Sequence, residues 1–151
     1  TMGIRTHPNL RLTNGRGVTT ANGKAVNSAG QRDKELWGKR AKWVDYSGKI
    51  DGHTVGVAIF DHPDNQRHPT WWHARDYGLV AANPFGIHNF EGKKKGVGDF
   101  KLKKGERRNF LYGILFHEGD AETSDIAGSY DKWVQAVAAL KASAAEQPGN
   151  P

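Results

Sequence analysis

The sequence has no cysteine among its 151 residues, which excludes disulfide bonds, thiolate zinc sites and a cysteine nucleophile. It has no apolar run near the roughly 20 residues that a membrane-spanning helix needs. Its longest apolar segments, 55–60 and 111–116, have the length of single strands. Hydrophobic residues are scarce at 36%, but aromatic residues reach 10%, so a core can form and wholesale disorder is excluded. The length suits one domain, and we expect a soluble one without a membrane partner.

Several functional motifs are also missing. There is no Gly-x-Ser-x-Gly nucleophile elbow, no phosphate-binding loop with Gly-Lys-Ser/Thr and no dinucleotide fingerprint. The 22 Lys and Arg residues against 16 Asp and Glu give a formal charge of +6, much of it in 93–95 and 101–108. Such runs are usually solvated loops or a sheet rim, so we do not expect a nucleic-acid partner.

Alternating apolar residues indicate strands. The pattern predicts them over 42–47, 53–62, 71–81 and 107–117, with Gly- and Pro-containing connections between them. Residues 13–35 are polar and rich in Gly, Asn and Ser, which predicts a long loop with one weak hairpin at most.

The C-terminal segment has a helical pattern instead. Its apolar residues repeat at the spacing of one helix face: Ile126, Tyr130, Trp133, Val134 and Val137. Asp120 or Thr123 can cap its start, and 147–151 should be a frayed tail. We therefore predict a mainly β fold, an antiparallel, jelly-roll-like β-sandwich with one C-terminal α-helix, as a single domain over residues 1–146.

Residues 61–78 are the most informative for function, since they hold three of the seven histidines. In a strand, residues two apart share a face, so Trp71, His73, Arg75 and Tyr77 should point the same way. A row of Trp, His, Arg and Tyr is typical of a polar, aromatic-lined ligand cleft. The alternative is that the aromatic residues cap a sheet edge while His73 and Arg75 face solvent.

Three histidines suggest a second kind of site. His62, His68 and His73 end one strand, lie in the loop and enter the next strand, so they could converge on one cation. Imidazole is a suitable ligand for Zn, Cu or Fe. Their spacing matches no known metal motif, and the alternative is that they hydrogen-bond the loop backbone.

The end of the last predicted strand adds two candidates. His117 and Glu118 lie where a side chain can reach a cleft. Glu118 is a candidate general acid or base, or equally a salt-bridge partner for Arg75 or Arg67.

Six segments in order resemble the bacterial PmoA-like family: WGKRAKWVDYSG at 37–48, GVAIFDHP at 56–63, RHPT at 67–70, WHARDYG at 72–78, AANPFG at 81–86 and FHEGD at 116–120. The likeness covers about residues 3–140. The methane monooxygenase subunit of the same name is an integral membrane protein, and this sequence has no segment that could span a bilayer, so that activity is not implied.

The resemblance implies a bacterial protein that works among sugar-processing enzymes. It also implies a periplasmic or secreted location, although the sequence shows no signal peptide. Members of that family are about twice as long, and this chain resembles their C-terminal half. Either it is a fragment, or the fold closes by pairing with a second copy, and the second alternative predicts a homodimer.

Three hypotheses follow. The first is a carbohydrate-active enzyme, a lyase or hydrolase acting on a glycoside or oxidised sugar, with catalytic residues His62, His73, Arg75 and Glu118 and substrate-binding residues Arg67, Trp71, Trp72, Tyr77 and His117. The second is a mononuclear metal protein with oxidative activity on polysaccharide, its metal held by His62, His68 and His73. The third is a non-catalytic glycan-binding module. The sequence fixes no cofactor; the second hypothesis adds one divalent metal, Cu, Zn or Fe.

Overall fold

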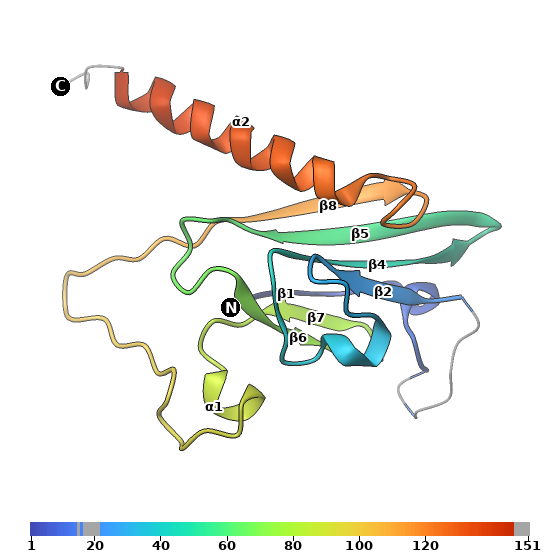
Figure 1. The fold of residues 1–151 in the computed structure, drawn as a ribbon, viewed down its shortest axis with the longest axis horizontal. Helices are drawn as coiled ribbons and strands as arrows, with labels where there is room; N and C mark the ends of the chain where they lie inside the picture. The colour runs from blue at the N-terminus through green and yellow to red at the C-terminus, as the bar shows by residue number, and fades with distance from the viewer. Residues whose placement is uncertain (15, 17–21, 147–151) are drawn as a thin grey trace.

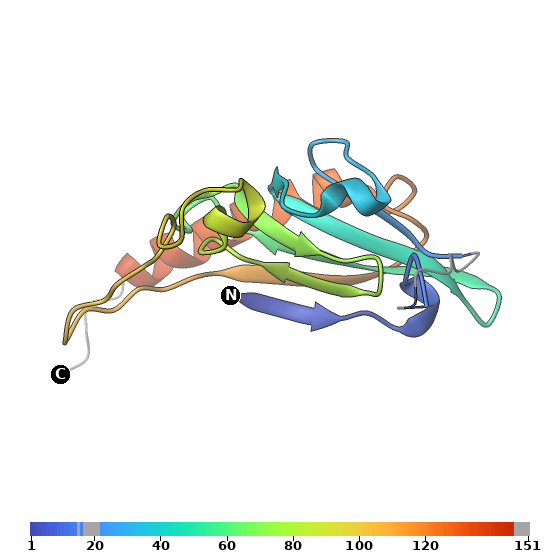
Figure 2. The ribbon, with the colours of Figure 1, turned by 90° about the horizontal axis from the view of Figure 1, so that it is seen from below.

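The fold was analysed in a computed structural model that describes residues 1–14, 16 and 22–146. Two antiparallel sheets of four strands each face one another (Figures 1 and 2). The larger sheet has the order β2-β4-β5-β8 and consists of β2 (Lys24–Asn27), β4 (Trp43–Ile50), β5 (His53–Asp61) and β8 (Tyr112–Glu118). The smaller has the order β1-β7-β6-β3 and consists of β1 (Met2–Arg5), β7 (Leu79–Ala82), β6 (Thr70–Ala74) and β3 (Arg40–Ala41). The predicted β-sandwich is confirmed.

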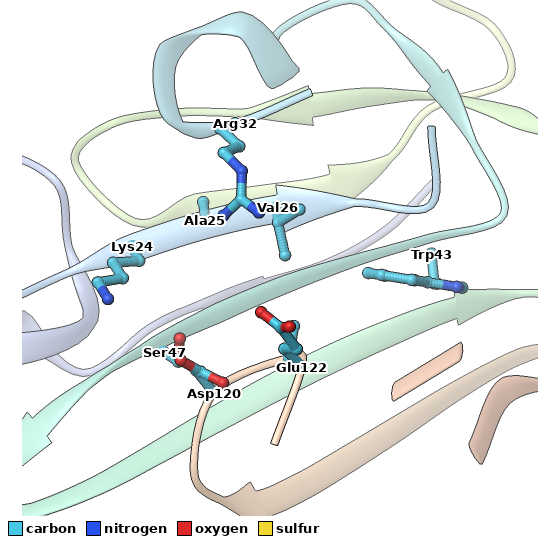
Figure 3. Close-up of a pocket in the computed structure, with 9 residues that line it drawn as sticks. Lys24, Ala25, Val26, Arg32, Trp43, Ser47, Asp120 and Glu122 are labelled. Atoms are coloured by element: carbon cyan, nitrogen blue, oxygen red, sulfur yellow. The ribbon is translucent and has the colours of Figure 1, made fainter. Parts of the chain in front are cut away.

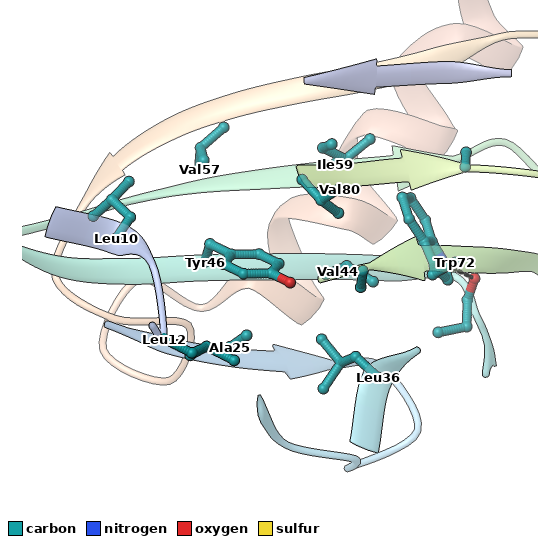
Figure 4. Packing of buried hydrophobic residues seen from close by; sticks show 13 residues of the cluster. Leu10, Leu12, Ala25, Leu36, Val44, Tyr46, Val57, Ile59, Trp72 and Val80 are labelled. Carbon is teal, nitrogen blue, oxygen red and sulfur yellow. Dashed lines mark hydrogen bonds between the residues drawn. The ribbon is translucent and has the colours of Figure 1, made fainter. Parts of the chain in front are cut away.

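The two sheets pack through the side chains that alternate toward each other. Val44 and Tyr46 of β4 point inward from the larger sheet, and Trp72 of β6 meets them from the smaller one (Figure 4). All three side chains are fully buried. The short helices η1 (Pro8–Leu10) and η2 (Asp33–Leu36) add Leu10 and Leu36 to this core. Burial of such side chains is the main source of stability, at about 25 cal/mol per Å² of apolar surface.

Helix α2 (Ile126–Glu146) covers the other face of the larger sheet, as predicted (Figure 1). Its buried residues Ile126 and Tyr130 contact Trp43, Ala58 and Phe60, which form a second apolar cluster. Asp120 and Thr123 exchange hydrogen bonds of 2.9 and 3.0 Å in the turn before the helix, six and three residues before its first residue. The side chain that bonds the first turn is instead that of Asp125, which accepts a 3.0 Å hydrogen bond from the backbone N–H of Gly128. The predicted frayed tail, 147–151, lies outside the described residues. No helix in the described part of the chain has both the length and the apolarity to cross a bilayer.

One strand prediction was wrong. The segment 71–81 is not a single strand but the hairpin of β6 and β7, joined by a turn at 75–78. Arg75 and Leu79 close it through a 2.8 Å backbone hydrogen bond, and Gly78 supplies the positive φ of 84° that the turn requires. The predicted strands at 42–47 and 53–62 correspond to β4 and β5, and the one at 107–117 begins later, at Tyr112. Part of the predicted 13–35 loop forms β2, and 15 and 17–21 lie outside the described residues.

Candidate functional site

A cavity of about 350 Å³ opens on the outer side of the β6–β7 hairpin. Three of the four residues predicted to share a face line it, namely His73, Arg75 and Tyr77. Segments distant in sequence complete its wall: Trp37, Asn83, Asn89 and Phe90. We call this cavity the aromatic cleft.

The aromatic cleft is formed by strand β6, the turn that follows it, and residues near η2 and α1. His73 projects from β6, and Arg75 and Tyr77 follow in the hairpin turn. The short helix α1 (Ile87–Phe90) brings Phe90, whose ring lies 6.3 Å from that of His73 and 5.4 Å from that of Trp37, the latter edge-on. Aromatic rings at these distances attract one another, so they fix the walls of the cleft.

Arg75 is the charged group at the centre of this arrangement. Its guanidinium carbon lies 6.0 Å from the ring centre of Trp37 and 5.5 Å from that of Tyr77, within the range of cation–π attraction. Among the described residues no carboxylate forms an ion pair with Arg75, and its buried Nε has no hydrogen-bond partner. A buried donor without a partner is costly. An anionic ligand in the cleft would neutralise the unpaired charge of the guanidinium.

His73 is a neutral base in this setting. Burial lowers its pKa below the ordinary value, and the nearby charge of Arg75 lowers it further. The imidazole is therefore uncharged near neutral pH, with one nitrogen free to accept a proton. A neutral base next to an unpaired cation can remove a proton from carbon beside a carboxylate that the cation holds.

The two tryptophans of β6 lie outside the aromatic cleft. Trp71 is 7% exposed; its indole donates a 3.0 Å hydrogen bond to Glu91, and the guanidinium carbon of Arg40 lies 4.4 Å from its ring centre. Trp72 is 0% exposed and donates a 2.8 Å hydrogen bond to the carbonyl of Ala41. Trp72 is part of the core and has no surface to offer a substrate.

Arg67 was predicted to bind substrate, but its side chain holds a loop. Its guanidinium donates to the backbone carbonyls of Pro84 at 2.7 Å and Gly98 at 2.6 Å. These bonds join the loop of Arg67 to the turn before α1 and to the segment between α1 and β8, and they use both donors of its Nη1.

Of the other two predicted metal ligands, His68 bonds a buried carboxylate and His62 does not. Asp61 accepts hydrogen bonds from His68 at 2.8 Å, from the backbone of Thr70 at 2.9 Å and from Asn65 at 2.8 Å. Burial raises the pKa of Asp61, although these bonds oppose the shift. His62 instead packs edge-on against Trp133 of α2, with ring centres 5.4 Å apart, and burial lowers its pKa.

His73 does not join these two histidines in a metal site. Within residues 1–14, 16 and 22–146, no group of three or more His, Cys, Asp or Glu side chains is placed to hold a metal ion. The histidine-ligated metal hypothesis therefore has no ligand set in this part of the chain.

His117 and Glu118 point to opposite faces of β8. The ring of His117 lies over Gly56, where a Cβ would collide with it, and reaches Asp45 of β4 with an Nε2–Oδ1 distance of 2.7 Å. Its Nδ1 lies 3.0 Å from the hydroxyl of Ser124. Both side chains of the ion pair are buried, 6% exposed for His117 and 1% for Asp45. This pair fastens the β8–α2 connection to the sheet.

Glu118 lines a different cavity, on the inner side of β8. This groove of about 650 Å³ runs between β1 and β8 and is mainly apolar, with Ile4, Val55, Ile114 and Phe116 among its residues. Ile114 is 47% exposed and Phe116 79%. Glu118 is thus not placed with His73 and Arg75.

A third cavity, of about 410 Å³, lies between β2 and the turn before α2 (Figure 3). Arg32 and Glu122 point toward one another across it, and Lys24 and Asp120 lie at its end. None of the predicted catalytic, substrate-binding or metal-ligating residues lines this cavity, so it contributes nothing to the predicted site.

Sequence reasoning missed four residues of the aromatic cleft. Asn83 lies in the turn after β7, where its Oδ1 accepts a 3.1 Å hydrogen bond from the backbone of Phe85 and its side chain lines the cleft. Trp37, Asn89 and Phe90 were not singled out. Trp37 carried no local signal for this position, since it is 37% exposed and reaches the cleft only through the fold.

Comparison with known proteins identifies the family of this chain but assigns it no function. Neither a curated protein nor a solved structure matches the chain. Residues 1–131 match the model of a family of unknown function, DUF6807; that match carries no activity and leaves the resemblance to PmoA-like proteins a prediction. The matched segment is most of the chain, which therefore belongs to the DUF6807 family.

Proposed function

We propose that this protein binds an acidic sugar in the aromatic cleft and cleaves its glycosidic bond by β-elimination. The observation that carries the proposal is Arg75, a cation with no acidic partner among the described residues, beside the neutral base His73. The aromatic faces of Trp37 and Tyr77 suit sugar rings, and the amides of Asn83 and Asn89 suit hydroxyl groups.

The composition of the cleft favours elimination over hydrolysis. Most glycoside hydrolases use a pair of carboxylates on either side of the scissile bond. No Asp or Glu is among the residues that line the aromatic cleft, and Glu118 lines the groove on the inner side of β8. Elimination from a uronate requires only a base, a proton donor and a group that neutralises the substrate carboxylate.

The three polar side chains divide these tasks. Arg75 holds the carboxylate and stabilises the negative charge that develops when the neighbouring C5–H bond breaks. His73 takes that proton, and a C4–C5 double bond forms as the C4–O bond breaks. The phenol of Tyr77 supplies the proton for the departing oxygen. The products are one unsaturated uronate and one new chain end, and no oxidant is needed.

The test is an elimination assay with purified protein. Polygalacturonate, alginate and a glucuronate-containing polymer are incubated with it, and the unsaturated product is followed by its ultraviolet absorbance. We expect absorbance to rise with at least one polymer and no product from neutral dextran. A His73→Ala variant should lose roughly 10²–10⁴-fold in rate, the usual contribution of a general base.

Two outcomes would contradict the enzymatic proposal. Binding of an acidic oligosaccharide without product would make the aromatic cleft a non-catalytic glycan-binding site. If wild-type protein neither binds nor converts any acidic sugar of the panel, the assignment of the cleft to acidic sugars fails.

We also propose that two copies associate through β8, which is an edge strand. The bonds from Gly119 N to Thr54 O and from His62 N to Leu111 O show that odd-numbered residues of β8 pair with β5. The backbone groups of Ile114 and Phe116 therefore point away from the sheet. A twofold antiparallel pairing that sets Ile114 opposite Phe116 of the partner would satisfy these groups and cover both side chains.

Light scattering over a dilution series measures this association. We expect a dimer mass for the wild type and a monomer mass for Phe116→Lys. Leu140→Lys is the matched control, because Leu140 is 68% exposed but lies on α2. A wild-type monomer at the highest concentration would rule the interface out.

A further inference from the structure

The segment 92–110 leaves α1 and reaches β8 without forming a helix or strand, as an arm that extends beyond the sheets (Figure 1, yellow). It carries eight Lys and Arg residues and two acidic ones, a formal charge of +6, which equals the formal charge of the whole chain. The remaining residues are therefore balanced in charge. We call this segment the basic arm; its cations are Lys93, Lys94, Lys95, Lys101, Lys103, Lys104, Arg107 and Arg108.

The cations of the basic arm are free to meet a ligand. All eight are exposed, and none takes part in the ion pairs found among the described residues. Eight like charges on one arm repel each other, and that repulsion is relieved when a polyanion neutralises them.

The basic arm is nevertheless fixed to the body of the protein. Arg67 donates to the carbonyl of Gly98 in the middle of the arm. The rings of Phe100 and Phe110 lie 5.6 and 5.7 Å from that of Phe85, which precedes α1. The arm is thus anchored at its middle and its end, and its charges have a defined place.

The basic arm begins at the rim of the aromatic cleft. Asn89 and Phe90 line the cleft, and Lys93 follows three residues after Phe90. The backbone N–H of Lys93 donates a 3.0 Å hydrogen bond to the carbonyl of His88 in α1. A chain of sugars that leaves the cleft on this side meets the first three lysines at once.

We propose that the protein binds a long, carboxylated polysaccharide at two places. One sugar residue occupies the aromatic cleft, and the basic arm binds the sugars that follow it in the polymer. This inference rests on the proposed function and extends it from a single acidic sugar to a long acidic polymer. The ligand carries one carboxylate per sugar, and a carboxylate is also the group that Arg75 would bind in the cleft. Lysine charges on an arm contribute attraction along a polymer without selecting one sugar residue.

A single-stranded nucleic acid is the competing polyanion, and the arm is less suited to it. Proteins that bind single strands add aromatic side chains on which the bases stack. The two aromatic residues of the basic arm, Phe100 and Phe110, are engaged with Phe85. The exposed large hydrophobic residues of the arm are Val97 and Leu102, which offer no stacking surface.

The experiment compares a polymer with a short oligomer. Binding of polygalacturonate and of trigalacturonate is measured by calorimetry for the wild type, for Lys93→Gln/Lys94→Gln/Lys95→Gln, and for a control that replaces three exposed lysines elsewhere, Lys34→Gln/Lys49→Gln/Lys132→Gln. The arm variant should bind the polymer about tenfold more weakly and with a smaller salt dependence, because fewer counterions are released. Binding of the trimer should stay within about twofold in both variants, and the control should bind the polymer like the wild type.

The outcomes separate this inference from the function on which it rests. Equal polymer affinity of the arm variant and the wild type would overturn it, and so would tighter binding of single-stranded DNA than of polygalacturonate. If the wild type binds no trimer but its polymer affinity still depends on the arm, the proposed cleft function fails while the basic arm remains a polysaccharide site.

Discussion

Replacing Arg75 with glutamine should lower kcat/KM on an acidic oligosaccharide by roughly 10²–10³-fold, the usual loss when one donor to a developing oxyanion is removed. Glutamine retains a donor but lacks the charge that would hold the substrate carboxylate. Arg75→Lys should be intermediate, because lysine keeps the charge and loses the planar pair of donors. The melting temperature should change little, since the side-chain interactions lost among the described residues are the cation–π contacts with Trp37 and Tyr77, worth about 1 kcal/mol or less at such sites.

Ile59→Ala supplies the contrast for this prediction. Ile59 is 0% exposed in the centre of β5, so its truncation should cost about 2–5 kcal/mol in the free energy of unfolding. The folded fraction of that variant should keep its kcat/KM. Steady-state kinetics and thermal melts on both variants decide the matter: an Arg75→Gln protein that melts early but turns over normally would be structural, and the cleft assignment would be wrong.

The sequence predicted the larger sheet well because its strands have a buried face and local turns. Alternation around Val44 and Tyr46 and around Val57 and Ile59 follows directly from packing against the second sheet. The β6–β7 hairpin was missed because polar and apolar residues continue to alternate through its turn. That turn is stabilised by residues from other parts of the chain. Tyr46 donates a 3.1 Å hydrogen bond to the carbonyl of Arg75, and the backbone N–H of Leu12 donates to the carbonyl of Asp76 at 2.9 Å.

The functional face was predicted in part because its residues are close in sequence. His73, Arg75 and Tyr77 share the aromatic cleft, whereas Trp71, on the same side by its spacing, is covered by its contacts with Glu91 and Arg40. No local pattern shows that β3 will pair with β6 and set Arg40 opposite Trp71, where its guanidinium lies over the indole. Equally, Trp37 reaches the cleft only through the fold.

The divergence of the histidines has a similar cause. His62 and His68 are six residues apart, but the buried Asp61 binds His68, while α2, more than 60 residues further along, supplies Trp133 against His62. The pairing of Asp45 with His117 also needs the register of three strands, in which Asp45 lies opposite Ala58 and Gly56 opposite His117. Such contacts cannot be read from spacing along the chain.

His117→Ala should lower the free energy of unfolding by about 3–5 kcal/mol, the usual cost of removing one partner of a buried ion pair. The substitution would leave Asp45 in the sheet with neither carboxylate oxygen bonded, because its Oδ2 already has no hydrogen-bond partner. It would also release Ser124 from the 3.0 Å contact that ties the turn before α2 to β8. Chemical denaturation followed by tryptophan fluorescence measures the loss.

A matched substitution separates the ion pair from histidine loss in general. His53 begins β5 and is exposed, so His53→Ala should change the free energy of unfolding by no more than about 0.5 kcal/mol. Similar losses in the two variants would show that the Asp45–His117 pair contributes no special stability.

The contribution of the same pair to the stability of the wild type should fall as pH rises. Burial alone would lower the pKa of His117, but its hydrogen bond to Asp45, the charge of Asp45 and the carbonyl of Glu118 outweigh burial and raise it. Burial also raises the pKa of Asp45, against the opposing effect of His117. Both groups therefore hold their protons more tightly in the folded than in the unfolded state. The stabilisation from His117 is complete below its ordinary pKa and is lost as the pH passes its raised folded pKa.

Denaturation at a series of pH values from about 6 to about 9 tests this sign, because the ordinary pKa of histidine is about 6.5. Asp45→Asn keeps the shape of the side chain but removes the charge that raises the pKa of His117. The lowered pKa values of His62 and His73 make stability rise with pH in this interval, and they act equally in both proteins. The wild type should therefore be more stable than Asp45→Asn at the acidic end, and the difference between the two proteins should shrink as the pH rises. A difference that stays constant or grows with pH would mean that His117 is neutral in the folded protein.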